Sequence, residues 1–222
     1  WFQSLPLYSS SSFIFSGKTS YLNQTSKTIY NYIDSTGVGL PYKFSDFYGK
    51  LSFSSPNGSK VNMYGFGFND NVNYVDVTEM GWLTYGFGSN ILLVPASAKM
   101  LVEGRISYSK YDVFQEDFEQ PRNTSSIGGY NIGLNFSYLI SQEHKFKYGA
   151  EILGQSTLLE FRNLIGTLIT DDDNYDVFSA YVDYKYNNNR LIVNPGIRIQ
   201  SYTSMGEVSV EPRLGVKYNL NE

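Results

Sequence analysis

The sequence predicts an all-β fold, an antiparallel meander of about ten strands, from two observations. Large apolar residues alternate with small or polar ones along most of the chain, and turn residues separate the alternating stretches. Successive side chains of a strand point to opposite faces, so each stretch has one apolar and one polar face. We expect no helix. Residues 130–140 show the alternation best, where the large apolar side chains are Tyr130, Ile132, Leu134, Phe136, Tyr138 and Ile140.

The expected strands form one domain over residues 1–222. They lie at 12–22, 43–54, 60–69, 80–94, 99–112, 126–140, 145–161, 176–186, 191–203 and 207–219. Several of them exceed the five or six residues that are usual in soluble sheets.

The connections between these strands are expected to alternate in length. The short turns are "PNGS" (56–59), "PASA" (95–98), "SQEHK" (141–145) and "NNNR" (187–190). Longer polar segments, expected as loops, fall at 69–79, 111–126 and 162–176. Short turns at one end and long loops at the other are typical of outer-membrane β-barrels.

Composition excludes several classes of protein. The purest apolar run, "ILLV" at 91–94, is much shorter than the ~20 residues that a membrane-spanning helix needs. Mean hydropathy is −0.28, which the alternating strands of a membrane barrel also produce. The net charge is −4, and the sequence lacks the clustered Lys and Arg residues that bind nucleic acid. The absence of cysteine removes disulfides, thiolate catalysis and Cys-based zinc sites, and it fits an oxidising compartment.

The two faces favour a transmembrane barrel over a soluble sandwich. The polar face is rich in Gly, Asn, Ser and opposite charges, such as Glu103 and Arg105 or Glu211 and Arg213. The apolar face carries Tyr and Phe near strand ends, where they suit the lipid headgroup level. We therefore expect the apolar face to meet outer-membrane lipid and the polar face to line a lumen. A soluble carbohydrate-binding β-sandwich that uses exposed Tyr and Trp is the less favoured alternative.

The expected lumen-facing charges could contact a plug or line a solute path, although we expect most to pair across neighbouring strands. They are Glu103, Arg105, Lys147, Glu151, Asp183, Lys185, Arg198, Glu211, Arg213 and Lys217.

No residue pattern indicates an enzyme or a cofactor. His144 is the only histidine, and it is expected as a solvated residue of the turn "SQEHK". The acidic run "DDDNYD" is expected in a loop, where Asp171, Asp173 and Asp176 form a weak Ca²⁺ candidate. The run lacks the spaced ligands, glycine and closing Glu of an EF-hand, so a solvated loop is the favoured interpretation.

Four stretches taken together resemble the barrel of TonB-dependent outer-membrane receptors, particularly those of the Bacteroidota. They are "SFIFSGKTSYLNQTSK" (12–27), "LPYKFSDFYGKLSF" (40–53), "NGSKVNMYGFGFNDNVNY" (57–74) and "NPGIRIQSYTSMGEVSVEPRLGVKYNL" (194–220). Their order and spacing match across nearly the whole chain, although each alone is mostly barrel strand and turn.

The resemblance implies a 22-stranded barrel with an N-terminal plug that imports scarce nutrients with energy passed on by TonB. Ten strands without a plug or a TonB-contacting segment lead us to expect an internal section of such a receptor. The implied partners are the plug, the rest of the barrel, TonB through segments outside this section, and a surface lipoprotein or other envelope subunit. The alternative is a self-contained ten-stranded barrel with a structural, adhesive or accessory role in the envelope.

Overall fold

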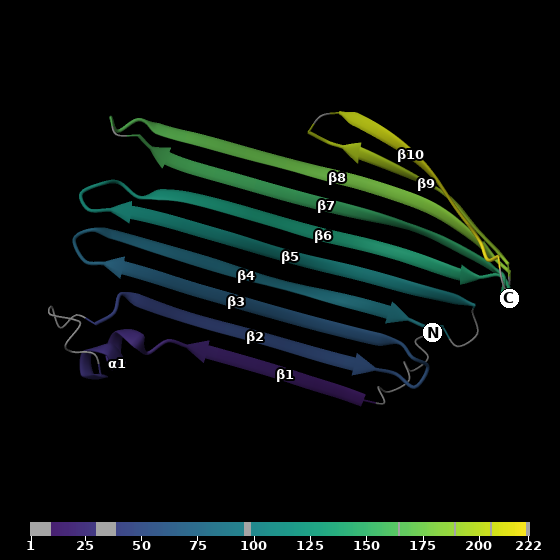
Figure 1. The fold of residues 1–222 in the computed structure, drawn as a ribbon, viewed down its shortest axis with the longest axis horizontal. Helices are drawn as coiled ribbons and strands as arrows, with labels where there is room; N and C mark the ends of the chain where they lie inside the picture. The colour runs from purple at the N-terminus through teal and green to yellow at the C-terminus, as the bar shows by residue number, and fades with distance from the viewer. Residues whose placement is uncertain are drawn as a thin grey trace, which may run out of the picture.

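The computed structural model describes residues 10–29, 39–95, 99–163, 165–188, 190–204 and 206–220. They form one ten-stranded antiparallel sheet in which every strand pairs with its sequence neighbours, in the order β1 to β10 (Figure 1). The strands are β1 Ser10–Thr19, β2 Tyr42–Ser54, β3 Lys60–Tyr74, β4 Thr78–Leu93, β5 Met100–Asp117, β6 Asn123–Leu139, β7 His144–Arg162, β8 Leu168–Asn187, β9 Leu191–Tyr202 and β10 Glu207–Tyr218. The predicted all-β meander is confirmed.

The expectation of no helix was wrong. A short helix, α1 (Leu22–Ile29), follows β1, where a strand had been expected to continue to residue 22. The Ser20 hydroxyl accepts a hydrogen bond from the Leu22 amide (3.2 Å), which caps the start of this helix. The buried Ser26 hydroxyl accepts one from the Leu40 amide (2.8 Å) and ties α1 to the start of β2. Within the described residues, no helix is long and apolar enough to cross a membrane.

The long loops expected at 69–79, 111–126 and 162–176 were also wrong, because most of these residues extend the strands. β3 continues to Tyr74, β5 to Asp117, and β8 begins at Leu168. Only a few residues are left for each connection, and Asp76 and Glu119 adopt a positive φ of 57° in two of them. Their polar sequences had suggested loops. A strand whose two faces are both exposed to water is, however, as polar in composition as a loop.

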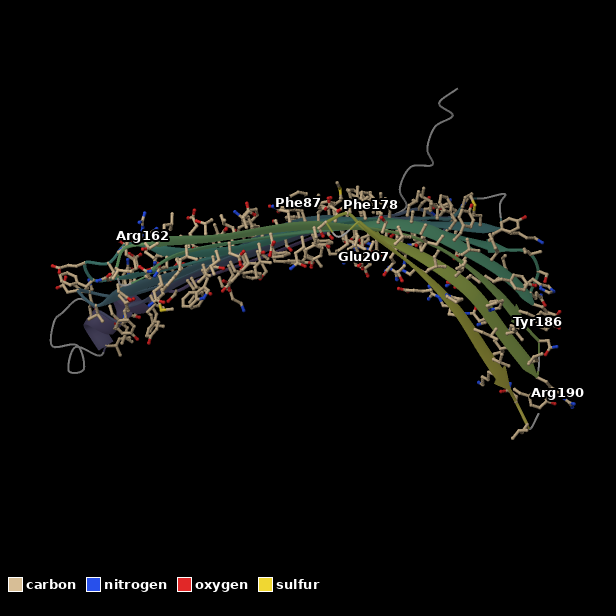
Figure 2. The ribbon with its side chains drawn as sticks, turned by 90° about the horizontal axis from the view of Figure 1, so that it is seen from above. Phe87, Arg162, Phe178, Tyr186, Arg190 and Glu207 are labelled. Atoms are coloured by element: carbon tan, nitrogen blue, oxygen red, sulfur yellow. The ribbon has the colours of Figure 1, made fainter. Side chains whose placement is uncertain are left out.

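The sheet is curved, and its two faces differ in chemistry. Phe87 and Phe178 lie on the convex side, whereas Glu207 lies on the concave side (Figure 2). Directly paired residues share a face, so the register assigns Ile106, Ile132 and Ile152 to the convex side with Phe178. The described residues contain no buried hydrophobic side chain. The sheet therefore has no internal core, and its apolar groups are presented outward.

The convex apolar residues form a band of limited height. In β5 it runs from Met100 to Tyr108 and in β6 from Tyr130 to Tyr138, about nine residues each, which is the length of a membrane-spanning strand. Beyond Tyr108 the convex face of β5 becomes polar, with Lys110 bonded to Asp112 (3.0 Å). We call the strand ends near α1 the α1 end, and the opposite ends the His144 end (Figure 1).

Gly154 provides a test of the packing on the convex face. The Tyr130 ring lies over Gly154, and its hydroxyl donates to Asp176 on the next strand (2.9 Å). A Cβ at residue 154 would contact the ring and lie 2.6 Å from the Asp176 Oδ1 atom. We expect Gly154→Ala to lower the free energy of unfolding from lipid vesicles by about 1–3 kcal/mol.

Gly104→Ala is the matched control, since its nearest neighbour, the Ile91 Cβ atom, would be 3.7 Å away. This change is expected to cost less than about 0.5 kcal/mol. Equal losses in the two variants would contradict the packing described for Tyr130.

Candidate functional site

The concave face carries every charge predicted to face a lumen. Two rows of directly paired residues cross it from β5 to β10. The first contains Glu103, Asn135, Gly149, Tyr181, Arg198 and Glu211, and the second contains Arg105, Gly133, Glu151, Ser179, Gln200 and Ser209. Lys147, Asp183 and Arg213 follow in the next row towards the His144 end, with Lys185 and Lys217 beyond them.

Glu151 is the centre of the polar contacts on this face. Its Oε1 atom lies 3.3 Å from the Arg105 Nη2 atom and accepts a hydrogen bond of 2.6 Å from the Asn131 amide. Its Oε2 atom lies 3.9 Å from the Arg198 Nη2 atom. Arg198 also donates to the buried Ser179 hydroxyl (3.1 Å). One carboxylate thus joins two guanidinium groups from β5 and β9.

Glycines in the intervening strands allow these contacts. Arg105, Gly133 and Glu151 lie in one row, and the absence of a side chain at Gly133 lets Arg105 reach Glu151 two strands away. Arg213 reaches Asp183 (3.6 Å) across Gly196 in the same way. The Tyr181 hydroxyl donates to Asn135 (2.7 Å) across Gly149.

The charges were predicted to pair across neighbouring strands. The ion pairs of Arg105 and Arg198 with Glu151 and of Arg213 with Asp183 instead each cross one intervening strand. Arg105 and Arg213 do not bond Glu103 and Glu211, their same-strand neighbours, in the described residues. The Arg105 and Arg213 guanidinium groups are directed instead to Glu151 and Asp183, across Gly133 and Gly196.

The acidic run 171–176 is not a loop, which corrects the prediction. These residues belong to β8 and pair with β7, for example Asp171 with Leu159 and Asp173 with Thr157. Asp171 and Asp173 point to the concave face and Asp176 to the convex face, where it accepts a hydrogen bond from Tyr130. The three carboxylates cannot meet at one Ca²⁺ ion, and no cluster of three potential metal ligands occurs in the described ranges.

His144 is also placed differently from the prediction. It is the first residue of β7 and not a solvated turn residue. Its ring stacks with Tyr184 and Tyr186 on the convex face, at centroid distances of 5.9 and 5.1 Å. An imidazole among tyrosines at the edge of the apolar band suits the lipid headgroup level.

A second concave surface, towards the α1 end, was missed by the sequence analysis. There the large side chains change face, and the concave side carries Phe66, Phe68, Trp82, Tyr111, Leu153 and Tyr175. A hollow of about 340 Å³ lies among Tyr111, Ile127, Leu153 and Gln155. The signal was present in β3, where the large apolar residues change parity from Val61 and Met63 to Phe66 and Phe68.

Comparisons with known proteins identify the fold. No protein-family model matches the chain, and no curated protein matches it in sequence. Several solved structures are similar, among them two transporters. One is the outer-membrane transporter YddB of Escherichia coli, with a TM-score of 0.60, 11% identity, and coverage of 81% of this chain and 30% of YddB. The other is the FrpB iron transporter of Neisseria meningitidis, with a TM-score of 0.61, 10% identity, and coverage of 94% and 39%.

These likenesses show that the sheet has the fold of an outer-membrane transporter barrel wall. The matched region spans less than two fifths of either transporter. Their transport activities belong to the complete proteins.

Glu151 allows a test of the concave network. We expect Glu151→Gln to lower the free energy of unfolding from vesicles by about 0.5–1.5 kcal/mol, because two half-exposed guanidinium groups lose a shared carboxylate. In an Arg105→Gln background the same change should cost less, since one of its contacts is already absent. Glu103→Gln is the control, because Glu103 forms no ion pair within the described ranges. Full additivity of the Arg105 and Glu151 changes would contradict the network.

Proposed function

We propose that this chain is part of the barrel wall of a TonB-dependent outer-membrane receptor. Such a receptor imports a scarce nutrient, of the siderophore, haem, peptide or glycan class. The observation that carries the proposal is the arrangement of the two faces, with an apolar convex band and a charged, hydrogen-bonded concave side. A soluble sheet places its apolar face on a core, whereas a membrane barrel turns it towards lipid.

The dimensions of the convex band support this placement. Phe87 packs on Tyr108 at its α1 margin (5.6 Å between centroids), and Phe136 stacks on Tyr148 towards the His144 end (4.9 Å). Rows of aromatic rings at both margins of an apolar band are a feature of outer-membrane barrels. Outer-membrane lipid is therefore the proposed partner of this surface.

The strand lengths support an orientation. β7 has 19 residues and β8 has 20, about twice the 9–11 that a tilted membrane strand needs. The excess lies at the α1 end, where the convex face carries ion pairs such as Arg122 with Glu116 (2.8 Å). We propose that this end projects beyond the lipid on the cell exterior, because the strand extensions lie there together with the longest connection between the described strands, residues 20–41, and outer-membrane barrels keep short turns on the periplasmic side.

The sheet edges support a larger closed assembly. In the described part of the chain, β1 and β10 each have one neighbouring strand. An unpaired edge cannot face hydrocarbon, because each free amide or carbonyl would cost several kcal/mol. In the proposed receptor, further strands satisfy both edges in the membrane. In the proposed receptor those strands, the plug and the TonB-contacting segment complete the transporter.

The inverted faces can be tested with adjacent substitutions in β5. Ile106 lies within the convex band, one turn of the alternation inside Tyr108, and is 51% exposed, whereas Ser107 lies on the concave face. We expect Ile106→Arg to lower the free energy of unfolding from vesicles by about 2–4 kcal/mol, because it places a charge in hydrocarbon. Ser107→Arg should cost less than about 1 kcal/mol, since its guanidinium remains in a polar environment. Equal costs would contradict the membrane assignment.

The topology can be tested with single cysteines, because the native sequence has none. Thr167 lies in the β7–β8 connection at the α1 end, and Gln142 lies in the β6–β7 connection at the His144 end. In the native protein, we expect Thr167→Cys to react with a membrane-impermeant maleimide on intact cells. Gln142→Cys should react only after the outer membrane is permeabilised.

The labelled band also gives the size of the native polypeptide. A size several times the 25.2 kDa of this chain is the result expected for a plugged receptor. A band near 25.2 kDa with the same labelling would favour the self-contained barrel with a structural, adhesive or accessory role. Equal labelling of both cysteines on intact cells would overturn the proposed topology.

A further inference from the structure

Two aromatic rings lie across the wall in the α1 half of the concave face. Tyr64 and Phe66, on β3, are directly opposite Gly88 and Gly86 on β4. A Cβ atom at residue 88 would lie 2.7 Å from the Tyr64 Cζ atom, and one at residue 86 would lie 2.7 Å from the Phe66 Cζ atom. Each ring therefore occupies the space above the neighbouring glycine. The two rings extend along the wall and present their outer surface to the concave side.

These rings border a depression of small and neutral residues. The row that starts at Phe66 continues with Gly86, Ser109, Gly129, Gln155 and Tyr175. The hollow of about 340 Å³ lies in this row and its neighbours, where Ser107, Ser109 and Gly129 form a shallow floor. Gln155 accepts a hydrogen bond from the Tyr175 hydroxyl, and its amide nitrogen donates to no other residue in the part of the chain that the structure describes. Hydroxyl and amide groups therefore lie beside an aromatic surface.

The charges around this surface are almost all negative. Beyond the row of Ser107, the described concave positions of β3 to β8 carry no Lys or Arg and four carboxylates, which are Asp70, Asp117, Asp171 and Asp173. Lys110 contributes to the lining of the hollow, but its ammonium group belongs to the convex side, 3.0 Å from Asp112. Lys50 is opposite Tyr64, three strands away from Ser107. An anionic ligand would therefore meet mainly like charge here.

This charge balance discriminates among ligand classes. The carboxylates repel ligands with exposed anionic groups. A cationic ligand would be drawn to the carboxylates, but none of the four lines the hollow. An uncharged ligand that offers both C–H surface and hydroxyl groups matches the rings and the neutral polar groups together. A carbohydrate has this combination.

We propose that this surface binds an uncharged carbohydrate chain, with sugar rings against Tyr64 and Phe66 and hydroxyl groups bonded to Ser107, Ser109 and Gln155. The proposal rests on the proposed function, and it narrows the four nutrient classes to neutral glycans. The weakly positive C–H groups of a sugar are attracted to the negative face of an aromatic ring. Serine hydroxyl and glutamine amide groups can both donate and accept hydrogen bonds, as sugar hydroxyls require.

The test is retention of oligosaccharides by the native protein, purified in detergent from its own membrane. The probe is a mixture of neutral linear oligosaccharides of glucose, mannose, xylose and galactose, and the comparison is the same mixture after chemical sulfation. Native mass spectrometry identifies the bound species. We expect a neutral oligosaccharide to be retained and its sulfated form to bind about tenfold more weakly or less. Retention of no neutral oligosaccharide, or equal retention of both forms, would overturn the proposal.

Phe47 provides a matched control for Phe66, because its ring also covers a directly opposite glycine, Gly67, but on the convex face. We expect Phe66→Leu, which keeps an apolar side chain without the ring, to weaken binding of the retained oligosaccharide by about 3–10-fold. Phe47→Leu should leave the affinity unchanged, although it too removes a ring from a glycine. Phe66→Trp should keep the binding. Equal losses of affinity in the two Leu variants would assign the Phe66 ring a purely structural role and overturn the proposal.

Salt dependence separates a carbohydrate from a cationic ligand such as a basic peptide. Binding of a neutral oligosaccharide should be the same at low and high salt, because no ion pair forms. Oligolysine is the cationic probe, and we expect it to bind more weakly than the retained oligosaccharide. Tighter binding of oligolysine that is lost at high salt would overturn the proposal in favour of a basic peptide.

These outcomes are separable from failure of the proposed function. The cysteine positions 167 and 142 lie outside the hollow, so their labelling reports membrane topology alone. Correct labelling without oligosaccharide binding would remove the carbohydrate ligand and leave the barrel wall intact. Oligosaccharide binding together with equal labelling of both cysteines on intact cells would overturn the transport function and favour the soluble carbohydrate-binding sheet.

Discussion

The structure depends on one constraint, the need to satisfy every backbone amide and carbonyl between neighbouring strands. The ten strands achieve this through an uninterrupted ladder from β1 to β10, without an apolar core on either face. In water, such a sheet would expose a broad apolar surface at a large cost in free energy. In lipid, the hydrocarbon chains cover that surface and the cost disappears. The hydrogen bonds between strands therefore fix the backbone. The solvent on each face, water or lipid, then decides whether polar or apolar side chains are favourable there.

With the backbone fixed in this way, glycine determines which polar side chains can meet. On the concave face Gly133, Gly149 and Gly196 each lie between two partners that bond across them. On the convex face Gly154 lies in the same way between Tyr130 and Asp176. A Cβ atom at Gly149, Gly154 or Gly196 would overlap one of the bonded partners, whereas a Cβ atom at Gly133 would lie 3.9 Å from the Arg105 Nη2 atom, at ordinary contact distance. The glycines therefore act as openings in the side-chain layer, beyond their usual role of relieving crowding on a curved wall.

The fold was predictable because alternation is a local property. Stretches such as 130–140 and 145–152 carry it in every residue, and the strands there match the prediction closely. The strand ends were not predictable, because polar runs such as 111–117 and 168–176 read as loops when neither face needs to be apolar. The ion pairs also required the register: Arg105 and Glu151 are 46 residues apart, and the sequence does not show that Gly133 lies between them. The helix α1 has only eight residues, too few for a periodic pattern that would have predicted it.

The change of face along the strands connects the fold to its proposed role. In the lipid-length half of β5 and β6 the large side chains are convex. Beyond Tyr108 and Tyr130, Tyr111, Val113 and Ile127 are concave, and Phe114 is the large side chain that stays convex. One solvent along the whole convex face does not account for both parts of these strands. If lipid covered the entire convex face, Lys110 and Asp112 would not lie on it. The inversion follows if the sheet leaves the bilayer partway along its strands. The outer half then has water on its convex side, and the aromatic groups on its concave side lie within an enclosed vestibule above the charged wall. In the proposed receptor, the membrane boundary would therefore divide the concave face into an aromatic part near the α1 end and a charged part near the His144 end.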